Sequence, residues 1–400
     1  MSYENTLKQY FKYPNDFKKM YEEKYSSSST LHFNFIINEH PSFFFYNLPI
    51  FEKVLSIYQK SNVLNDIFKS LPPIAAKQYI RNTLVVEVKK TNEIEGVFSS
   101  RKEIFELVED LKNIKSNKIG SIINKYLMLL DENNSNKDIR TCADIRGIYN
   151  DMFYSDGVSL IDKKNELDGL YFRNNFVGVY DSNDRLIHKG ISGEKNIISG
   201  MEEALEVLNN NEINIFIRLA IFHYMFEYIH PFYDGNGRVG RYIISQKLYN
   251  EIDDVFAFRV SAAINAKKNK YYRAFEDTED TRNYGDITTF VYEFLDIIEE
   301  EYDNSIEYAK SKKELLDRIN KEIIEKNKNK YSKHQNDVLW VLAQAYVFSD
   351  FGVTAQEISD VVGVSVKTIR RVLASFKSEE ILKEEKYSKA MFYSLQNIMI

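Results

Sequence analysis

The sequence predicts a mainly α-helical protein with one β-hairpin near its middle and a small domain of helices and strands at its C-terminal end. Three observations lead to this fold class. Apolar residues recur at spacings of three and four along much of the 400-residue chain, which is typical of helices packed on a core. Residues 172–191 place two apolar runs around a turn-forming cluster, as a hairpin does. Residues 336–400 combine short helical stripes with two strand-like runs.

The first 120 residues are expected to form an N-terminal helical region. Before residue 75, helix-like patches surround a polar loop at Ser26–Thr30 and an aromatic run at His40–Tyr46, and we expect this part to pack as helices against the core. Apolar residues then recur at helical spacing from about residue 78. Gly96 is placed to end this helix, because glycine adopts the left-handed conformation of a helix stop.

Glu95 is an acid in the last turn of this predicted helix. The carbonyl groups at a helix C-terminus carry partial negative charge, so the helix dipole disfavours a carboxylate there. A glutamate in such a place favours an external cation as its partner.

A twelve-residue run that begins at His230 reads His-Pro-Phe-Tyr-Asp-Gly-Asn-Gly-Arg-Val-Gly-Arg and carries most of the functional information in the chain. The segment before it, Asn214–Ile229, has the spacing and apolar content of a buried helix. Pro231 cannot continue that helix and favours an extended conformation at His230. A second helix is expected to start near Arg238, with Asn236 as its N-cap.

These residue types suit a nucleotide phosphate site with a base beside it. The first N–H groups of a helix favour an anion, and Gly235 and Gly237 let a phosphate approach the backbone closely. Arg238 and Arg241 share a helix face and can both bind phosphate oxygens. A histidine can accept the proton of an attacking hydroxyl, and one carboxylate is sufficient for a Mg²⁺ ion that keeps several waters.

The run resembles the motif of the Fic family, His-Pro-Phe-x-(Asp/Glu)-Gly-Asn-Gly-Arg-x-x-Arg, at every defining position. Fic proteins are mostly adenylyltransferases, which transfer AMP from ATP to a protein hydroxyl. The resemblance implies that His230 takes the proton from that hydroxyl and that Asp234 holds Mg²⁺ at the α- and β-phosphates. It also implies that the anion hole is formed by Gly235, Asn236 and Gly237. Arg238 and Arg241 would contact the outer phosphates, and Phe232 would anchor the loop in the core.

A second resemblance concerns self-inhibition. Fic proteins that inhibit themselves carry Ser/Thr-x-x-x-Glu-Gly/Asn, and Thr91, Glu95 and Gly96 are similar to that pattern. The resemblance implies that Glu95 pairs with Arg241 and blocks the position of the ATP γ-phosphate. It places the chain in the class with an N-terminal inhibitory helix, here at about residues 78–96. In some related proteins the same glutamate supports removal of AMP, so the direction of the reaction stays open.

The predicted hairpin comprises Phe176–Tyr180, a turn at Asp181–Asp184 and the run Arg185–His188. It resembles the flap that Fic proteins carry beside the active site. The resemblance implies that the flap aligns an extended segment of the target protein by strand addition. We expect His188 to lie at the rim of the site and His223 to be a packed or hydrogen-bonded histidine.

The remaining domains follow from composition and spacing. Residues 121–305 are expected to form the mostly helical Fic catalytic core, and the Lys-, Glu- and Asn-rich residues 306–335 a charged linker helix. Residues 336–400 resemble a winged helix-turn-helix, in which Thr354 caps a helix that ends at Gly363. From residue 333 onward the charges of eight Lys or Arg and eight Asp or Glu cancel, so this domain is neutral. A DNA-binding domain usually has a basic excess, and contact with DNA or with another protein is therefore left open.

Composition indicates a non-secreted enzyme. The net charge of −6 gives no general reason for binding nucleic acid or membranes, and an apolar fraction of 44% is ample for the cores of two or three domains. The single cysteine, Cys142, excludes an internal disulfide framework. The chain shows neither a secretion signal nor an apolar run long enough to span a bilayer. We therefore expect a cytoplasmic protein without membrane contact, and a homodimer stays open.

The sequence thus predicts an ATP- and Mg²⁺-dependent protein adenylyltransferase, a nucleotidyltransferase that Glu95 holds inactive. Its acceptor would be a Tyr, Thr or Ser hydroxyl of a protein, which could be the chain itself. Two alternatives remain. One is an enzyme that removes AMP with the help of Glu95, and the other is a DNA-binding regulator whose Fic core senses a ligand.

Overall fold

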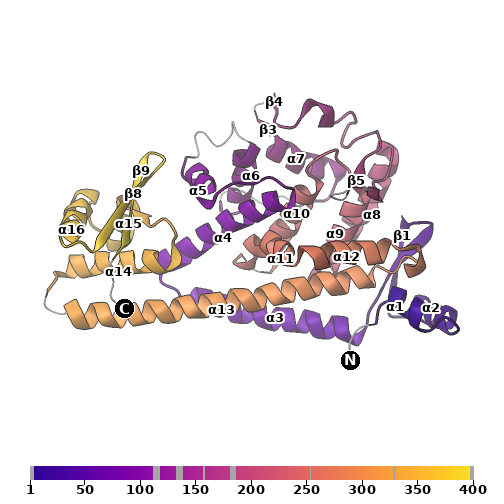
Figure 1. Ribbon diagram of the computed structural model, residues 1–400, viewed down its shortest axis with the longest axis horizontal. Helices are drawn as coiled ribbons and strands as arrows, with labels where there is room; N and C mark the ends of the chain where they lie inside the picture. The colour runs from indigo at the N-terminus through magenta and orange to yellow at the C-terminus, as the bar shows by residue number, and fades with distance from the viewer. Residues whose placement is uncertain are drawn as a thin grey trace.

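The computed structural model describes residues 4–110, 118–131, 138–155, 158–180, 186–252, 254–327 and 330–396. Within these residues the protein is mainly helical, as predicted, and its strands are short (Figure 1). The helices are α1 (Thr6–Lys12), α2 (Phe17–Tyr25), α3 (Leu48–Lys69), α4 (Pro73–Ile94), α5 (Arg101–Glu109), α6 (Lys118–Leu127), α7 (Cys142–Phe153), α8 (Glu194–Asn209), α9 (Ile215–Ile229), α10 (Asn236–Glu251), α11 (Val260–Ala266), α12 (Lys268–Glu279), α13 (Thr288–Asn327), α14 (Lys333–Phe348), α15 (Ala355–Val362) and α16 (Val366–Ser378). The strands are β1 (Thr30–Ile37), β2 (His40–Phe45), β3 (Tyr154–Ser155), β4 (Val158–Ser159), β5 (Gly178–Tyr180), β6 (Leu186–Lys189), β7 (Val353–Thr354), β8 (Leu382–Tyr387) and β9 (Ala390–Leu395).

Helices α9 and α10 form the centre of the fold. Every residue of α9 from Ile215 to Phe226 is buried, and α10 is buried from Asn236 to Leu248. A helix that is apolar on nearly all sides, as α9 is, belongs in an interior, and α8, α10 and α13 pack around it. The turn between α9 and α10 carries the motif that begins at His230, so both ends of its loop are held by buried helices.

Helix α13 is a single helix of 40 residues, about 60 Å long. It packs against α3, α9 and α12 and also against α14, and in Figure 1 it runs along the lower side of the molecule beside α3. The predicted linker at residues 306–335 is therefore not a separate element. Its first part continues the last helix of the core without a break, because a Lys- and Glu-rich segment favours the helix as strongly as the apolar segment before it.

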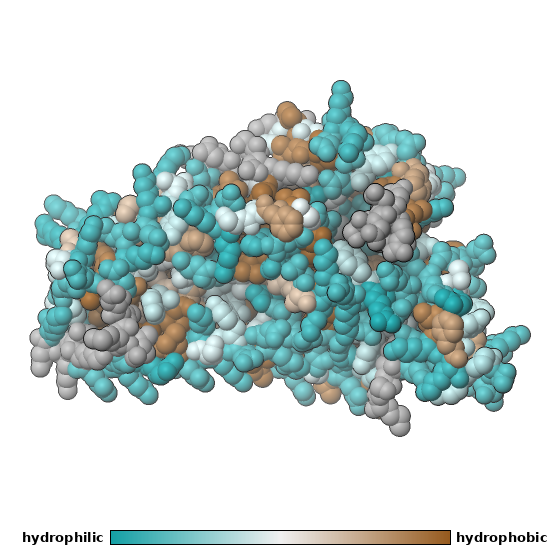
Figure 2. Space-filling view, in the orientation of Figure 1, coloured by the Kyte–Doolittle hydropathy of each residue, from teal (hydrophilic) through white to brown (hydrophobic). Residues whose placement is uncertain are grey.

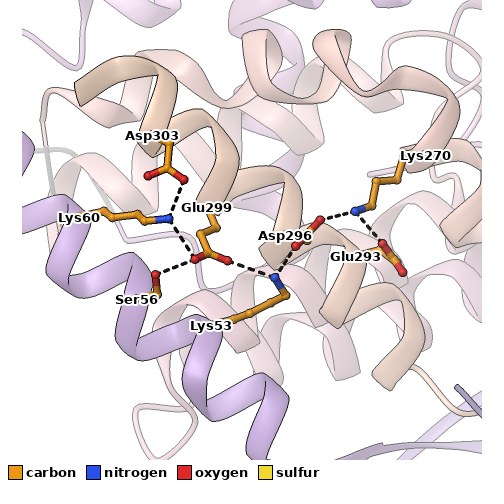
Figure 3. A network of polar contacts seen from close by, with 8 residues as sticks. All are labelled: Lys53, Ser56, Lys60, Lys270, Glu293, Asp296, Glu299 and Asp303. Atoms are coloured by element: carbon orange, nitrogen blue, oxygen red, sulfur yellow. Dashed lines mark hydrogen bonds and ion pairs between the residues drawn. The ribbon is translucent and has the colours of Figure 1, made fainter. Parts of the chain in front are cut away.

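An ion-pair network ties α3 and α12 to α13 (Figure 3). Lys53 and Lys60 of α3 both contact Glu299 of α13, at nitrogen–oxygen distances of 3.1 and 3.0 Å. Asp296 of α13 accepts hydrogen bonds from Lys53 and also from Lys270 of α12. Networks of partly buried charges hold geometry better than isolated surface pairs. The position of α12 is thus linked through α13 to α3.

The N-terminal region contains a β-hairpin, β1–β2, where the sequence led us to expect helical packing. Its two-residue turn is Asn38–Glu39, and both residues have positive φ, 45° and 76°, as in the tight turns that match the twist of paired strands. The expectation for His40–Tyr46 was wrong because the neighbouring segment alternates with a period of two. Phe35 and Ile37 of β1 are buried, whereas the alternating residues Asn34 and Ile36 are exposed.

Residues 333–396 form a small domain in which α14, α15 and α16 accompany a sheet of strand order β7-β9-β8. Thr354 and Glu357 make a capping box at the start of α15, and Gly363 ends that helix with a φ of 75°. The side chain of Ser365 caps α16. The predicted helices, caps and strands are confirmed, whereas the assignment to the winged helix-turn-helix class stays a prediction.

The C-terminal domain rests directly on α4, the helix that precedes Glu95. Asn82 of α4 donates a hydrogen bond to the carbonyl of Phe348 at 2.6 Å. Near the start of α4, the N–H of Ala75 donates to the side chain of Gln344 at 3.2 Å. Two polar bridges between buried residues therefore fix the orientation of α14 on α4.

An aromatic cluster joins the same domain to α5. Phe105 is fully buried and stacks on Phe351, with ring centroids 4.0 Å apart. The rings of Tyr387 and Phe392 meet Phe105 edge-on at 5.5 and 5.3 Å. Because Phe105 is the member from outside the C-terminal domain, it anchors that domain to the rest of the protein.

The face of the molecule seen in Figure 2 is mostly hydrophilic, and its hydrophobic residues lie in separate patches. Single exposed apolar residues are normal on protein surfaces. Across the residues that the structure describes, no helix combines the length and the apolar character needed to cross a bilayer.

Replacing Phe105 by Ala should loosen the contact between α5 and the C-terminal domain. Removal of a buried phenylalanine costs about 3–5 kcal/mol. We expect Phe105→Ala to lower the melting temperature and to separate unfolding of the C-terminal domain from unfolding of the core, measured by calorimetry. Phe51→Ala is the matched control, because Phe51 on α3 is 64% exposed, and it should change neither. A single unchanged transition in Phe105→Ala would contradict this docking.

Candidate active site

His230 ends α9 in a left-handed conformation, with φ 53° and ψ 60°. Its N–H still donates to the carbonyl of Phe226 at 3.0 Å, so the helix ends abruptly and the chain turns into the loop. The predicted extended conformation is wrong. Pro231 disfavours the right-handed helical region for His230, but the left-handed region remains open. This conformation costs a residue other than glycine about 1–2 kcal/mol, so other contacts must hold it.

Arg173 supplies those contacts. Its guanidinium is fully buried and donates to the carbonyls of His230 at 2.8 Å and Ile229 at 3.2 Å. It also donates to the carbonyls of Ile191 at 2.7 Å and Asn175 at 2.5 Å, on either side of the flap. Burial lowers the pKa of Arg173 to about 10, which still leaves it charged at neutral pH. The sequence did not identify this residue, because one arginine in a loop forms no pattern.

Asn236 is the first residue of α10 and does not cap it. The capping position belongs to Gly235, with a φ of 90°. The side chain of Asn236 bridges the backbone of Phe232 instead, accepting from its N–H and donating to its carbonyl, both at 2.8 Å. The N-cap prediction is therefore wrong, since the tight loop uses the amide itself. Phe232 is fully buried and stacks on Tyr149 at 4.0 Å, which confirms its role as the anchor of the loop.

The start of α10 presents backbone N–H groups to a cavity. The helical bonds of α10 begin with the N–H of Val239, which donates to the carbonyl of Gly235 at 3.0 Å. The N–H groups of the three preceding residues therefore have no place in the hydrogen-bond ladder of this helix. Gly235, Asn236 and Gly237 all line the cavity. Together with the positive end of the helix dipole, they favour an anion there.

The cavity has a volume of about 380 Å³, which is suitable for a small ligand. Its walls come from the end of α9, the loop and start of α10, the C-terminus of α4, the flap and α12. The predicted site residues that line it are His230, Asp234, Gly235, Asn236, Gly237, Arg241 and Glu95. Thr91, Gly96 and Arg238 do not belong to the lining.

Glu95 and Arg241 form an ion pair, with 2.8 Å between Oε1 and Nη2. Glu95 follows the last residue of α4, and Gly96 ends the helix with a φ of 74°, as predicted. Thr91 supports the arginine twice, because its hydroxyl accepts from Nε and its carbonyl from Nη2, both at 3.0 Å. A Cβ at Gly237 would collide with this pair. The predicted pairing is therefore present, and it rests directly on the start of α10.

Asp234 and Arg238 contact each other, with 2.7 Å between Oδ1 and Nη2. The side chain of Asp234 is 30% exposed and faces the cavity, whereas Arg238 is buried over the ring of Phe153. A carboxylate beside a helix N-terminus that favours anions fits Mg²⁺, which takes many of its ligands from phosphate and water. The described residues contain no cluster of three or more His, Cys, Asp or Glu able to hold a metal. The role of Arg238 at the outer phosphates stays a prediction.

The site keeps His230 neutral. Burial, together with the positive charge of His188, lowers the pKa of His230 to about 4. Nδ1 of His230 lies 3.3 Å from the backbone oxygen of Glu227, which can only accept a hydrogen bond. The neutral ring therefore carries its proton on Nδ1, and Nε2 keeps a lone pair that can accept a proton.

His188, on β6, behaves in the opposite way. Its Nδ1 lies 2.9 Å from a carboxylate oxygen of Glu279, and its Nε2 lies 2.7 Å from the carbonyl of Tyr228. Burial lowers its pKa, but both partners are acceptors that favour the charged ring, and the net result is a raised pKa. His188 lines the cavity, and its ring centroid is 6.4 Å from that of His230, while its predicted place at the rim stays a prediction.

The other walls are the flap and α12. Strands β5 and β6 pair antiparallel, which confirms the predicted hairpin, while its predicted turn at Asp181–Asp184 lies outside the described residues. Gly178 and Val179 of the flap and Tyr271 on α12 all line the cavity. The hydroxyl of Tyr271 is 2.8 Å from Nε2 of His223, which is fully buried, so His223 is the packed, hydrogen-bonded histidine that we expected.

The fold places a helix N-terminus that favours an anion at a cavity inside a helical core. Residues 143–248 match the model of the Fic/DOC family. Over 72 residues the chain is 38% identical to a probable protein adenylyltransferase of Aquifex aeolicus (strain VF5). That match covers 18% of this chain and 20% of the relative, so the chain spans about a fifth of the length of this curated protein.

The chain is similar to two solved structures, and the first of them supports the same fold. A Fic family protein from Desulfovibrio desulfuricans G20 aligns with a TM-score of 0.50 at 16% identity, over 88% of this chain and 98% of that one. A Fic domain containing signaling protein from Bacteroides thetaiotaomicron VPI-5482 aligns with a TM-score of 0.43 at 16% identity, over 65% of this chain and 97% of that one. Residues 143–248, which contain the complete motif, thus form a Fic domain within this chain.

The pKa values of His230 and His188 are expected to be shifted in opposite directions from the usual value of a histidine. Burial and a positive neighbour penalise the charged ring of His230, which should stay neutral until the pH falls to about 4. The pKa of His188 is raised, so its ring should keep its proton at pH values where an ordinary histidine has lost it. NMR signals of the two rings followed against pH, and assigned with His230→Gln and His188→Gln, measure both values. In His188→Gln the pKa of His230 should rise, and titration of His230 near 6.5 in the unaltered protein would contradict a neutral, buried base.

Proposed function

We propose that this protein is an adenylyltransferase that transfers AMP from ATP to a Tyr, Thr or Ser hydroxyl of a protein, and that Glu95 restrains it. The Fic domain and the short match to a probable adenylyltransferase support this class of chemistry. One observation carries the proposal. A neutral His230, the carboxylate of Asp234 and an anion-binding helix N-terminus face a single cavity, in which Arg241 is occupied by Glu95.

In the proposed transfer, the acceptor hydroxyl oxygen attacks the α-phosphorus of ATP. The new oxygen–phosphorus bond forms, the bond from the α-phosphorus to the oxygen of the β-phosphate breaks, and pyrophosphate leaves with the electron pair. Nε2 of His230 takes the proton of the hydroxyl. The N–H groups at the start of α10 bind phosphate oxygens, because this chemistry depends mainly on positioning and charge neutralisation. Mg²⁺, which Asp234 would hold, neutralises phosphate charge when bound.

Glu95 supplies the proposed restraint. Its carboxylate already satisfies Arg241, so the outer phosphate of ATP must displace it to reach the guanidinium. Arg241 is 1% exposed, and a buried guanidinium that loses its partner is costly. When Glu95 is absent, the buried guanidinium still needs a negative partner, and this need favours binding of the phosphate. The same carboxylate at the cavity wall is also compatible with the alternative in which Glu95 orients a water that removes AMP.

Loss of Glu95 should activate transfer. We expect Glu95→Gly to label protein from α-labelled ATP and Mg²⁺ well above the unaltered chain. Addition of His230→Ala should reduce that labelling by roughly 10²–10⁴-fold, because the general base is gone. Glu93→Gly is the matched control, since Glu93 lies two residues away and pairs with Lys89 and Lys90 instead, and it should remain inactive.

The same assay distinguishes the alternatives. Absence of labelling in every variant, with cell lysate present, would contradict the adenylyltransferase proposal. Release of AMP from an adenylylated protein by the unaltered chain, and its loss in Glu95→Gly, would favour the AMP-removing enzyme.

We also propose that α16 contacts a partner of the protein. Its exposed residues include Lys367, Arg370 and Arg371, and the helix contains no acidic residue. This local basic excess favours a phosphate backbone or an acidic protein surface, although the domain as a whole is neutral. Fluorescence anisotropy with a mixed-sequence DNA duplex tests the first case. Binding that is lost in Arg370→Ala/Arg371→Ala would support DNA, and its absence at low salt would leave a protein surface as the partner.

A further inference from the structure

Glu227 is a carboxylic acid in the wall of the nucleotide cavity that the proposed transfer does not use. It lies on α9, one helical turn before His230. Its Oε1 is buried and has no hydrogen-bond partner in the part of the chain that the structure describes. A buried carboxylate without a donor is costly, so a group in this position is either neutral or awaits a ligand.

The surroundings hold the carboxyl group in place. Gly240 on α10 faces it so closely that a Cβ there would lie 2.9 Å from Oε1 of Glu227. The charged and titratable groups around Glu227 come from every neighbouring element, namely Arg241 of α10, Glu95 at the end of α4, His188 of β6, Tyr271 and Tyr272 of α12, and His223 of α9. Glu227 therefore lines the same cavity as Glu95 and Arg241, the ion pair that the outer phosphate has to open.

These groups act on Glu227 in different directions. Burial is the largest influence, and it raises the pKa of Glu227 to about 8, while Arg241 opposes this and Glu95 adds to it. At neutral pH the side chain is thus mainly the neutral acid. A neutral carboxylic acid has an O–H group that can donate a hydrogen bond, and phosphate oxygens are strong acceptors.

We propose that Glu227 binds the outer phosphate of the nucleotide as a neutral acid, donating its O–H to a phosphate oxygen beside Arg241 once Glu95 has moved away. This inference rests on the proposed function, which puts that phosphate at Arg241. When Glu227 loses its proton, it becomes a second internal carboxylate that repels the phosphate and competes with it for Arg241. Nucleotide binding to the ionised form therefore takes up one proton from solvent.

The pH dependence follows from this linkage. Below about pH 8 the acid is already protonated, and nucleotide affinity does not depend on its titration. Above that pH only the protonated fraction binds, so affinity should fall toward about tenfold per pH unit. The last ionisation of a phosphate group lies near 6, so the nucleotide itself contributes no proton in this range.

The test uses full-length Glu95→Gly, in which Arg241 is available to the nucleotide. A non-hydrolysable ATP analogue with Mg²⁺ is titrated by calorimetry between about pH 7 and pH 9.5, in two buffers with different ionisation enthalpies. We expect constant affinity up to about pH 8, a fall above it, and uptake approaching one proton per nucleotide at the upper end. This measurement needs no substitution at Glu227, so it remains decisive even if variants at that position fold poorly.

The matched variant is Glu95→Gly/Glu227→Gln, because glutamine keeps the shape and an N–H donor but cannot ionise. We expect its affinity to stay flat with pH and its proton uptake to vanish. Glu95→Gly/Glu276→Gln, which changes another acid of the same cavity, should keep both effects.

Two outcomes would overturn the inference alone. One is tight binding with a flat profile in Glu95→Gly, and the other is an unchanged fall in affinity in the Glu227→Gln variant. Absence of nucleotide binding at every pH in Glu95→Gly would overturn the proposed function and this inference with it.

Discussion

The ion pair between Glu95 and Arg241 is the contact on which the site depends. Arg241 is almost fully enclosed by α4 and α10, so its guanidinium requires a negative partner at all times. Glu95 provides that partner from within. In the proposed function a nucleotide phosphate replaces it. The remaining geometry follows from this constraint. Gly237 lacks a side chain where the pair rests, and Thr91 orients the arginine from the preceding turn of α4.

Burial determines the chemistry of the site as much as its shape. Helices α9 and α10 exclude water around the loop, which keeps His230 neutral and, one turn earlier, keeps Glu227 mostly protonated. The same enclosure requires Arg173 to satisfy its guanidinium with backbone carbonyls, and those bonds hold His230 in its left-handed conformation. A strained backbone position and a base with a free lone pair thus have a common cause in the dense packing at the end of α9.

Local features of the site could be predicted from the sequence. The motif from His230 to Arg241, the helix stop at Gly96 and the caps of the C-terminal helices depend on residues close together in the chain. Features that depend on contacts between distant segments could not be predicted. Arg173 gains its role only where the flap meets α9, and Glu227 only where α9 meets α10. The general preference of asparagine for the N-cap predicts that Asn236 caps α10, but in the tight loop its side chain bonds to the backbone of Phe232, four residues earlier.

Helix α4 has a further consequence, because it is fastened at both ends. Near its start it bonds to the C-terminal domain, and just beyond its end Glu95 lines the cavity and pairs with Arg241. A helix of 22 residues transmits displacement along its length with little bending. Free energies of coupling between two sites are reciprocal. A molecule that binds the C-terminal domain and draws Glu95 out of the cavity would, in the proposed function, bind more tightly when nucleotide is present. The domain would then report the occupancy of a cavity that it does not line.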